Sequence, residues 1–352
     1  MQTHLRAGVQ LHLSVQRRVP LPELVRLGRL AVDGGITQIW VTDNLNNRNP
    51  FVVLSALAGS LSVDLGLAVL VPYFHNPLEI AGAAAALNEL MDGRELSVGI
   101  ARGNQSTSSF IETPKPVTFV RETAESVKRL LHGEEVTFDR YPALADYFHL
   151  VPDAPLKLGF SAPDSIRLYC GGNGPLSLKV GGECMDGLIF GGTFQAVGLT
   201  GELPSLIQTF DEAGAGRGPL PKVAEIKLSV SKDHRAARSF VTNSAGTRIL
   251  SLRHRGYSNE AIEATGVSKA ELDRFELGWK AGASRDELAD LVTDSMIDAI
   301  FVAGDPAYCR ERMKAVRQLA CDNGFEQLMF SELGPDPEEG LRLLSDELLP
   351  AL

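Results

Sequence analysis

One glycine-rich turn in this 352-residue chain has the residue types and spacing of an anion-binding site. Residues 166–170 are mostly apolar and indicate a strand, residues 171–174 read Gly-Gly-Asn-Gly, and Pro175 follows where a helix can begin. Glycines let backbone N–H groups approach a phosphate closely, and the unpaired N–H groups of a helix start carry the positive end of the macrodipole. Proline suits this first turn because the donor that it lacks is unpaired there anyway. A second apolar run, residues 188–190, completes a predicted strand–helix–strand unit.

The overall charge excludes several classes of partner. The formal net charge is −10 and the sequence pI is near 5.3, which argues against a nucleic-acid groove or an anionic membrane surface. Any phosphate site must therefore be local, built from backbone groups and a few basic residues.

The cysteines and the N-terminus predict a protein of a reducing compartment. Cys170, Cys184, Cys309 and Cys321 have no metal-type spacing, so we expect buried free thiols and no metal site. The first residues, MQTHLRAG, contain no apolar signal region, and no stretch approaches the ~18 apolar residues of a membrane span. We expect a cytoplasmic location.

Along the whole chain, short apolar runs alternate with helical patterns. Strands are expected at residues 5–13, 39–41, 65–71, 96–100, 166–169, 188–190, 224–230 and 327–330. Eight alternating units favour an α/β fold of the (β/α)8 TIM-barrel type, with residues 1–352 as one domain. A doubly wound sheet fits less well, because no Gly-x-Gly-x-x-Gly turn follows the first strand.

Two segments interrupt this alternation. Residues 133–164 contain prolines and tyrosines and predict a small hairpin or excursion. Residues 233–298 are charged and helical in pattern with no strand candidate, so they predict a helical insertion.

In such a barrel the active site lies at the carboxyl ends of the strands, and the residues there are the candidates for chemistry. They supply amides, glycines and one carboxylate, without a Cys/His metal pattern or a Gly-x-Ser-x-Gly elbow. This set suits a bound cofactor that does the chemistry. The candidates are His12, Asp43, Asn44, residues 68–71, 102–105, 171–174 and 191–193, and Ser231.

Each candidate also has a purely structural interpretation. Asp43 can cap the next helix, and the asparagines of residues 46–49 can satisfy turn backbone. His12 and His75 can be satisfied packing residues instead of acid–base catalysts. Arg102 can be a surface ion-pair partner or a clamp on a phosphate or substrate.

Five segments carry a resemblance to a known family. They read WVTDNLNNRNPF (40–51), LGLAVLVPYFHNPLEIAGAAAALNELMDGRELSVGIARG (65–103), YCGGNGPLSLKVGGECMDGLIFGG (169–192), VTDSMIDAIFVAGDPAYCRERM (292–313) and GPDPEEGLRLL (334–344). In this order they resemble the bacterial luciferase-like superfamily, and most closely its branch of coenzyme F420-dependent reductases typified by methylenetetrahydromethanopterin reductase.

The resemblance implies a role for each matching residue. Asp43 would lie at the edge of the cofactor ring, and the Ala68–Val69 peptide would be a non-prolyl cis bond that forms a bulge behind that ring. The cofactor phosphate would be held by Gly172, Asn173, Gly174, Gly191, Gly192 and Thr193.

Two residues depart from the family pattern. Many relatives have His directly after the Asp of the second strand and a carboxylate after the Gly of the fourth, where this chain has Asn44 and Asn104. Amides do not titrate, so that proton-donating pair is absent. We expect a retained cofactor site and a changed substrate site, lined by Asn44 and Asn104, with His12 or His75 as the candidate proton donor.

The sequence thus predicts an oxidoreductase that uses coenzyme F420 to move a hydride to or from a small organic substrate. One alternative is an FMN-dependent monooxygenase on the same scaffold, and another is a flavin-binding protein without catalysis. A homodimer is expected, with the alanine-rich helix of residues 80–87 as a close-packing face.

Overall fold

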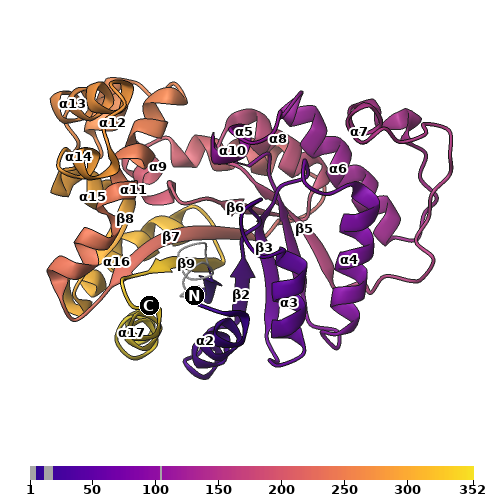
Figure 1. The fold of residues 1–352 in the computed structure, drawn as a ribbon, viewed down its shortest axis with the longest axis horizontal. Coiled ribbons are helices and arrows are strands. Elements are labelled where there is room, and N and C mark those ends of the chain that lie inside the picture. The colour runs from indigo at the N-terminus through magenta and orange to yellow at the C-terminus, as the bar shows by residue number, and fades with distance from the viewer. Residues whose placement is uncertain (1–4, 12–18, 104) are drawn as a thin grey trace.

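The computed structural model describes residues 5–11, 19–103 and 105–352. Eight parallel strands of these residues close into a barrel, in which each strand pairs with the next and the last pairs with the first (Figure 1). The predicted (β/α)8 barrel is therefore confirmed. The ring consists of β1 (Arg6–Leu11), β2 (Gln38–Val41), β3 (Asp64–Leu70), β4 (Leu96–Ile100), β5 (Ile166–Gly171), β6 (Gly187–Phe190), β7 (Lys222–Val230) and β9 (Gln327–Leu333).

A further strand, β8 (Phe301–Gly304), lies outside the ring and was not predicted. β7 is nine residues long, and only its first part, residues 222–224, pairs with β6. Residues 227–230 extend beyond β6, and β8 pairs with this exposed edge. A four-residue apolar run at the start of a helical pattern gave no local sign of this pairing.

Helices alternate with the ring strands and surround them. The main ones are α2 (Leu21–Asp33), α3 (Pro50–Ala58), α4 (Pro77–Glu89), α6 (Pro116–Leu131), α8 (Pro175–Cys184), α10 (Leu203–Ala213), α16 (Pro306–Asp322) and α17 (Pro337–Leu343), and shorter ones are α5 (Gln105–Ser108) and α9 (Phe194–Leu199). Several begin with Asn-Pro or Asp-Pro, and Asn49, Asn76, Asp305 and Asp336 each accept backbone N–H groups as caps.

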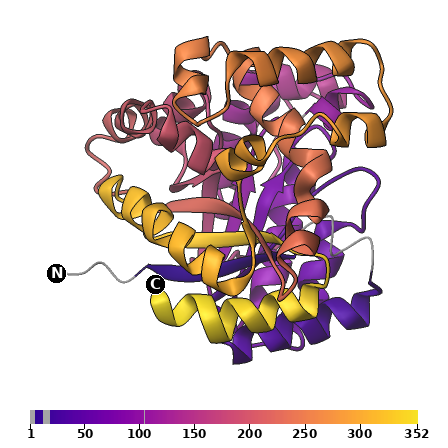
Figure 2. The same ribbon diagram turned by 90° about the vertical axis from the view of Figure 1, so that its left-hand side faces the viewer.

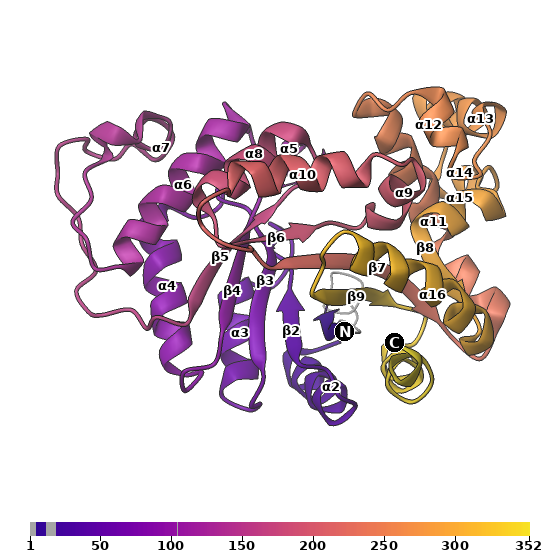
Figure 3. The ribbon, with the colours of Figure 1, turned by 180° about the vertical axis from the view of Figure 1, so that it is seen from behind.

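The C-terminal helix packs beside the first helix of the barrel. α17 contacts α2, and Figure 2 shows the two side by side along the bottom of the molecule. Seen from behind, α8 and α10 also lie together across the barrel (Figure 3). The helices thus form a continuous outer layer that buries the outward faces of the strands.

The predicted helical insertion is present as α11 (His234–His254), α12 (Asn259–Glu263), α13 (Lys269–Lys280), α14 (Arg285–Ala289) and α15 (Asp294–Ile300). In Figure 1, α12, α13 and α14 gather at the opposite end of the molecule from α4 and α7. The insertion leaves the barrel after β7 and returns into β8, so it stands at the carboxyl end of β7.

The segment 133–164 is an excursion without a hairpin. One isolated antiparallel bridge joins Val136 to Leu156, and between them lie a 3-10 turn (Phe138–Arg140) and helix α7 (Pro142–Phe148). Between the two bridge residues the chain folds into these helical turns, with Phe138 and Leu144 buried.

A small apolar cluster fills the barrel interior below the strand ends. Trp40 and Tyr169 meet edge to face with ring centroids 6.2 Å apart, and Ala68, Ile189 and Met329 pack with them. These buried side chains close the barrel interior below the site. In the described part of the chain no helix is long and apolar enough to cross a membrane, and no group of three potential metal ligands occurs.

Candidate functional site

A bulge in β3 marks one half of the site. The Ala68–Val69 peptide is cis, as expected, and the pairing of β3 with β4 shifts register between Leu67 and Leu70. The Ala68 carbonyl accepts hydrogen bonds from Gln10 Nε2 at 2.5 Å and Thr42 Oγ1 at 3.2 Å. Side chains from β1 and from the end of β2 therefore both hold the Ala68 carbonyl in place.

Asp43 fixes the bulge from the end of β2. Its Oδ2 accepts the Val71 N–H at 3.0 Å, and its own N–H donates to the Val69 carbonyl at 3.2 Å. Asp43 does not cap the next helix, which is the role of Asn49. The structural interpretation of Asp43 as a helix cap is therefore wrong.

His75 is buried between two carboxylates. Its Nε2 lies 3.2 Å from Asp43 Oδ2 and its Nδ1 lies 3.3 Å from Glu79 Oε1. Burial by itself lowers the pKa of His75, but the hydrogen bonds and charges of Asp43 and Glu79 outweigh it, so the pKa is raised. Each ring nitrogen thus has a carboxylate acceptor, which favours the imidazolium form.

The glycine turn after β5 forms the other half of the site, next to the bulge. A Cβ added at Gly171 would lie 2.3 Å from Val69 Cγ1, so only glycine lets the end of β5 approach the bulge this closely. Asn173 joins this turn to the end of β6: its Oδ1 accepts the Gly191 N–H at 2.9 Å, and its Nδ2 donates to Thr193 Oγ1 at 2.8 Å.

The start of α8 differs from that of the capped helices. Its N-cap residue is Gly174, no side chain caps it, and Pro175 occupies the first turn. A Cβ added at Gly174 would meet no described atom within 4 Å. The first backbone N–H groups of α8 are therefore suited to an anion, as the sequence predicted.

Charged residues of β7 and β9 lie beneath the Gly191–Gly192 turn. Lys227 Nζ contacts Glu225 Oε1 at 2.6 Å and Glu332 Oε1 at 3.3 Å, and only 2% of the Lys227 side chain is exposed. A Cβ at Gly192 would lie 2.3 Å from Lys227 Cε, which explains a glycine there. Glu332 has a left-handed backbone, with φ of 78°, which is uncommon for a non-glycine residue.

Comparison with known proteins agrees with this geometry. The profile of the family described as luciferase-like monooxygenase matches residues 1–323. The chain belongs to this family. It is 30% identical over 340 residues to 5,10-methylenetetrahydromethanopterin reductase of Archaeoglobus fulgidus, covering 94% of this chain and 96% of the relative.

Two further luciferase-like proteins show how far the likeness extends. An F420-dependent glucose-6-phosphate dehydrogenase of Microbacterium testaceum is 27% identical over 346 residues, covering 94% of this chain and 93% of the relative. The solved structure of coenzyme F420-dependent tetrahydromethanopterin reductase from Methanopyrus kandleri superposes with a TM-score of 0.79 at 22% identity, covering 99% of both chains. The structural likeness shows the luciferase-like fold.

The site residues predicted from the sequence meet in two groups. Asp43, Ala68, Val69 and His75 form the bulge group, and Gly172, Asn173, Gly174, Gly191, Gly192 and Thr193 form the turn group. Asn44 follows Asp43, and its Oδ1 accepts the Asn46 N–H at 3.5 Å within the loop. His12 and Asn104 lie outside the described residues.

The buried charged residues of β7 and β9 in this luciferase-like barrel were not predicted from the sequence. Glu225 and Lys227 stand two apart in an otherwise apolar strand, a spacing that places both on one face and could have indicated them. Glu332 gave no such signal, because its partner Lys227 is distant in sequence.

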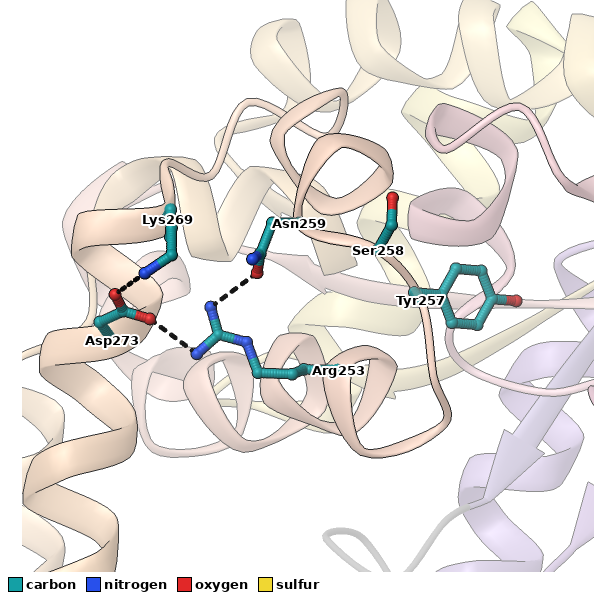
Figure 4. A pocket seen from close by; sticks show the side chains of 6 residues that line it. All are labelled: Arg253, Tyr257, Ser258, Asn259, Lys269 and Asp273. Atoms are coloured by element: carbon teal, nitrogen blue, oxygen red, sulfur yellow. Dashed lines mark hydrogen bonds and ion pairs between the residues drawn. The ribbon is translucent and has the colours of Figure 1, made fainter.

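A separate, open pocket of about 390 Å³ lies on the surface of the helical insertion, lined by Arg253, Tyr257, Ser258, Asn259, Lys269 and Asp273 (Figure 4). Its charges neutralise each other: Arg253 lies 2.8 Å and Lys269 2.5 Å from Asp273. The Tyr257 ring points away from this ion-pair cluster in Figure 4. The candidate site therefore stays at the strand ends, where Asp43, the amide of Asn173 and the uncapped start of α8 lie.

Proposed function

We propose that this protein is an F420-dependent oxidoreductase that transfers a hydride between the deazaflavin cofactor and a small organic substrate. The observation that carries the proposal is the contact between the two halves of the site, where Gly171 brings the glycine turn against the Val69 bulge. The relatives named above, among them F420-dependent enzymes, support the choice of F420.

The chain's residues fit such a cofactor. The uncapped α8 start, Gly172, Gly174 and the turn of residues 191–193 would hold its phosphate, and Asn173 keeps these two turns together. The Ala68–Val69 bulge would support the ring, and Asp43 would hold the bulge in shape. When bound, the reduced deazaflavin supplies the hydride.

We propose that His75 acts as a positioning residue. Both of its ring nitrogens face carboxylates, so the N–H groups of the imidazolium donate hydrogen bonds to Asp43 and Glu79. Asn44, Asn104 and His12 remain our candidates for the substrate side. The named relatives act on different substrates, so we assign only the class of a small organic molecule.

The test is a titration of the pure protein with F420 and, separately, with FMN. We expect tight binding of F420, weakened about tenfold by Asn173→Ala, because that variant loses the bridge between the two turns. Asn323→Ala, which removes a side-chain hydrogen bond to the Leu319 carbonyl at the far end of α16, is the matched control and is expected to bind like the wild type.

Tight FMN binding without affinity for F420 would replace this proposal by an FMN-dependent monooxygenase. Cofactor binding without turnover of any substrate would instead favour a flavin-binding protein that lacks catalysis, since Asn44 and Asn104 do not titrate.

We further propose a cytoplasmic homodimer. The four cysteines are free thiols, in keeping with a reducing compartment. One side of α4 packs against α3 and α6 and buries Ala81, Ala84 and Ala85. Gly82, Ala83 and Ala86 lie on its other side, where they are half-buried or exposed, and this side stays our candidate for the dimer contact. Light scattering of the pure protein measures the oligomeric state.

A further inference from the structure

A buried tyrosine beside the bulge contacts two segments that are distant from it in the sequence. Tyr73 is 2% exposed and lies in the loop between β3 and α4, two residues after Val71, whose N–H donates to Asp43. Its hydroxyl donates to the Pro114 carbonyl at 2.8 Å, and its own carbonyl accepts the Tyr147 hydroxyl at 3.4 Å. One residue therefore joins the bulge loop to the segment after β4 and to α7 of the excursion.

The ring of Tyr73 is held in place independently of its hydroxyl. It stacks on Phe119 of α6 with ring centroids 4.1 Å apart and planes 16° apart, and the Tyr147 ring meets it edge to face at 5.4 Å. A phenylalanine would make the same ring contacts. Burial raises the pKa of Tyr73 to about 12, so its hydroxyl remains a hydrogen-bond donor at neutral pH.

The segment that receives this hydrogen bond is tied to the rest of the protein at few points. Residues 107–116 connect the end of α5 to the start of α6. In the described part of the chain, the bond from Tyr73 is the only hydrogen bond that joins residues 110–114 to another element. The N–H groups of residues 110 and 111 bond locally, to the Thr107 carbonyl. The Tyr73 hydroxyl therefore fixes the position of this segment relative to the bulge.

The same segment borders both halves of the site. β4, from which it leads, stands between β3, whose bulge would support the cofactor ring, and β5, whose turn would hold the phosphate. Loops at the carboxyl ends of the strands build the active site in this type of barrel. The position of residues 107–116 thus decides how much room is left for a substrate beside the ring.

We propose that Tyr73 is a positioning residue that fixes residues 107–116 at the mouth of the site and thereby shapes the substrate pocket, while Tyr147 holds Tyr73 in place. The excursion then supports the site without contributing a residue that contacts a ligand. The assignment of this pocket to the substrate rests on the proposed function, whereas the two tyrosine hydrogen bonds do not.

Hydrogen–deuterium exchange of the pure full-length protein without cofactor tests these contacts. Tyr73→Phe keeps the ring and removes the hydroxyl, and we expect the amides of residues 107–113 to exchange about threefold to tenfold faster, the effect of losing one neutral hydrogen bond. Tyr147→Phe should have a smaller effect on the same amides, because its longer bond acts through Tyr73. A thermal melt shows whether each variant is folded.

Tyr308→Phe is the matched control. It removes a tyrosine hydrogen bond to Asp298 beside the insertion and should leave the exchange of residues 107–113 unchanged. The proposal is overturned if Tyr73→Phe and Tyr147→Phe both exchange this segment like the wild type. It is also overturned if their exchange rises equally along the whole chain, since that would show lost global stability alone. If Tyr73→Phe does not fold, Tyr147→Phe decides.

A titration with F420 tests the assignment to the substrate side. We expect Tyr73→Phe to bind F420 within about twofold of the wild type, because Gln10, Thr42 and Asp43 hold the bulge without its hydroxyl. A loss of about tenfold or more would mean that Tyr73 acts on the cofactor, which overturns this assignment. If the wild type does not bind F420, the proposed function fails and the exchange result stands, so the two proposals fail separately.

Discussion

Asp43 shows how one buried carboxylate fixes several neighbours. A single oxygen accepts the Val71 N–H and faces His75, while the backbone of Asp43 holds Val69. His75 extends this arrangement to Glu79. An imidazolium between two carboxylates is a stable arrangement at the pH where it is charged, so the bulge should depend on the protonation of His75.

The raised pKa of His75 determines whether the stability of the protein rises or falls with pH. Its stabilising contribution is complete below the ordinary histidine pKa near 6.5 and is lost as the pH rises through the raised value. Urea unfolding at pH 6 and pH 8.5 should therefore show a loss of stability in the wild type that His75→Gln does not show.

His132→Gln, at an exposed histidine, is the control and should keep the pH dependence of the wild type. An equal pH dependence in His75→Gln and the wild type would mean that folding does not change the pKa of His75, which would contradict the raised value.

Among the elements, β7 does the most to organise the barrel. It pairs with β6, β8 and β9, and its inward face carries Glu225 and Lys227. Lys227 reaches Glu332 of β9, so one buried ammonium links the two strands beneath the glycine turn. Buried charges are tolerated only when they are paired, which makes this lysine hard to replace.

Lys227→Met keeps the length of the side chain but removes its charge. It leaves Glu225 and Glu332 with less compensation, and the free energy of unfolding should fall by about 3–5 kcal/mol in urea titrations. Lys179→Met, on the exposed side of α8, should change it by no more than about 0.5 kcal/mol. Equal stability of Lys227→Met and the wild type would contradict the pairing described here.

The elements that could be predicted from the sequence are those that depend on residues close together in the chain. Strand–helix alternation, the Asn-Pro and Asp-Pro helix starts and the glycine turn depend on neighbouring residues. Partners far apart in sequence could not be predicted: Asp43 and Val71 are 28 residues apart, Arg255 and Thr193 are 62 apart, and Lys227 and Glu332 are 105 apart. β8 was missed for the same reason, because its pairing depends on the length of β7.

At the scale of the whole molecule, the barrel brings together groups from most of its strands. β2 and β3 supply Asp43 and the bulge, β5 and β6 supply the two turns, and the insertion after β7 supplies Arg255. The family resemblance predicted Asp43, the bulge and the two turns. The position of Arg255 beside Thr193 could be seen only in the folded structure.

A crystal structure of the protein with F420 bound tests the proposed site most directly. We predict the deazaflavin ring against the Ala68–Val69 bulge and the phosphate at residues 172–174 and 191–193. A ring bound elsewhere, such as in the pocket of the insertion, would contradict the proposed site.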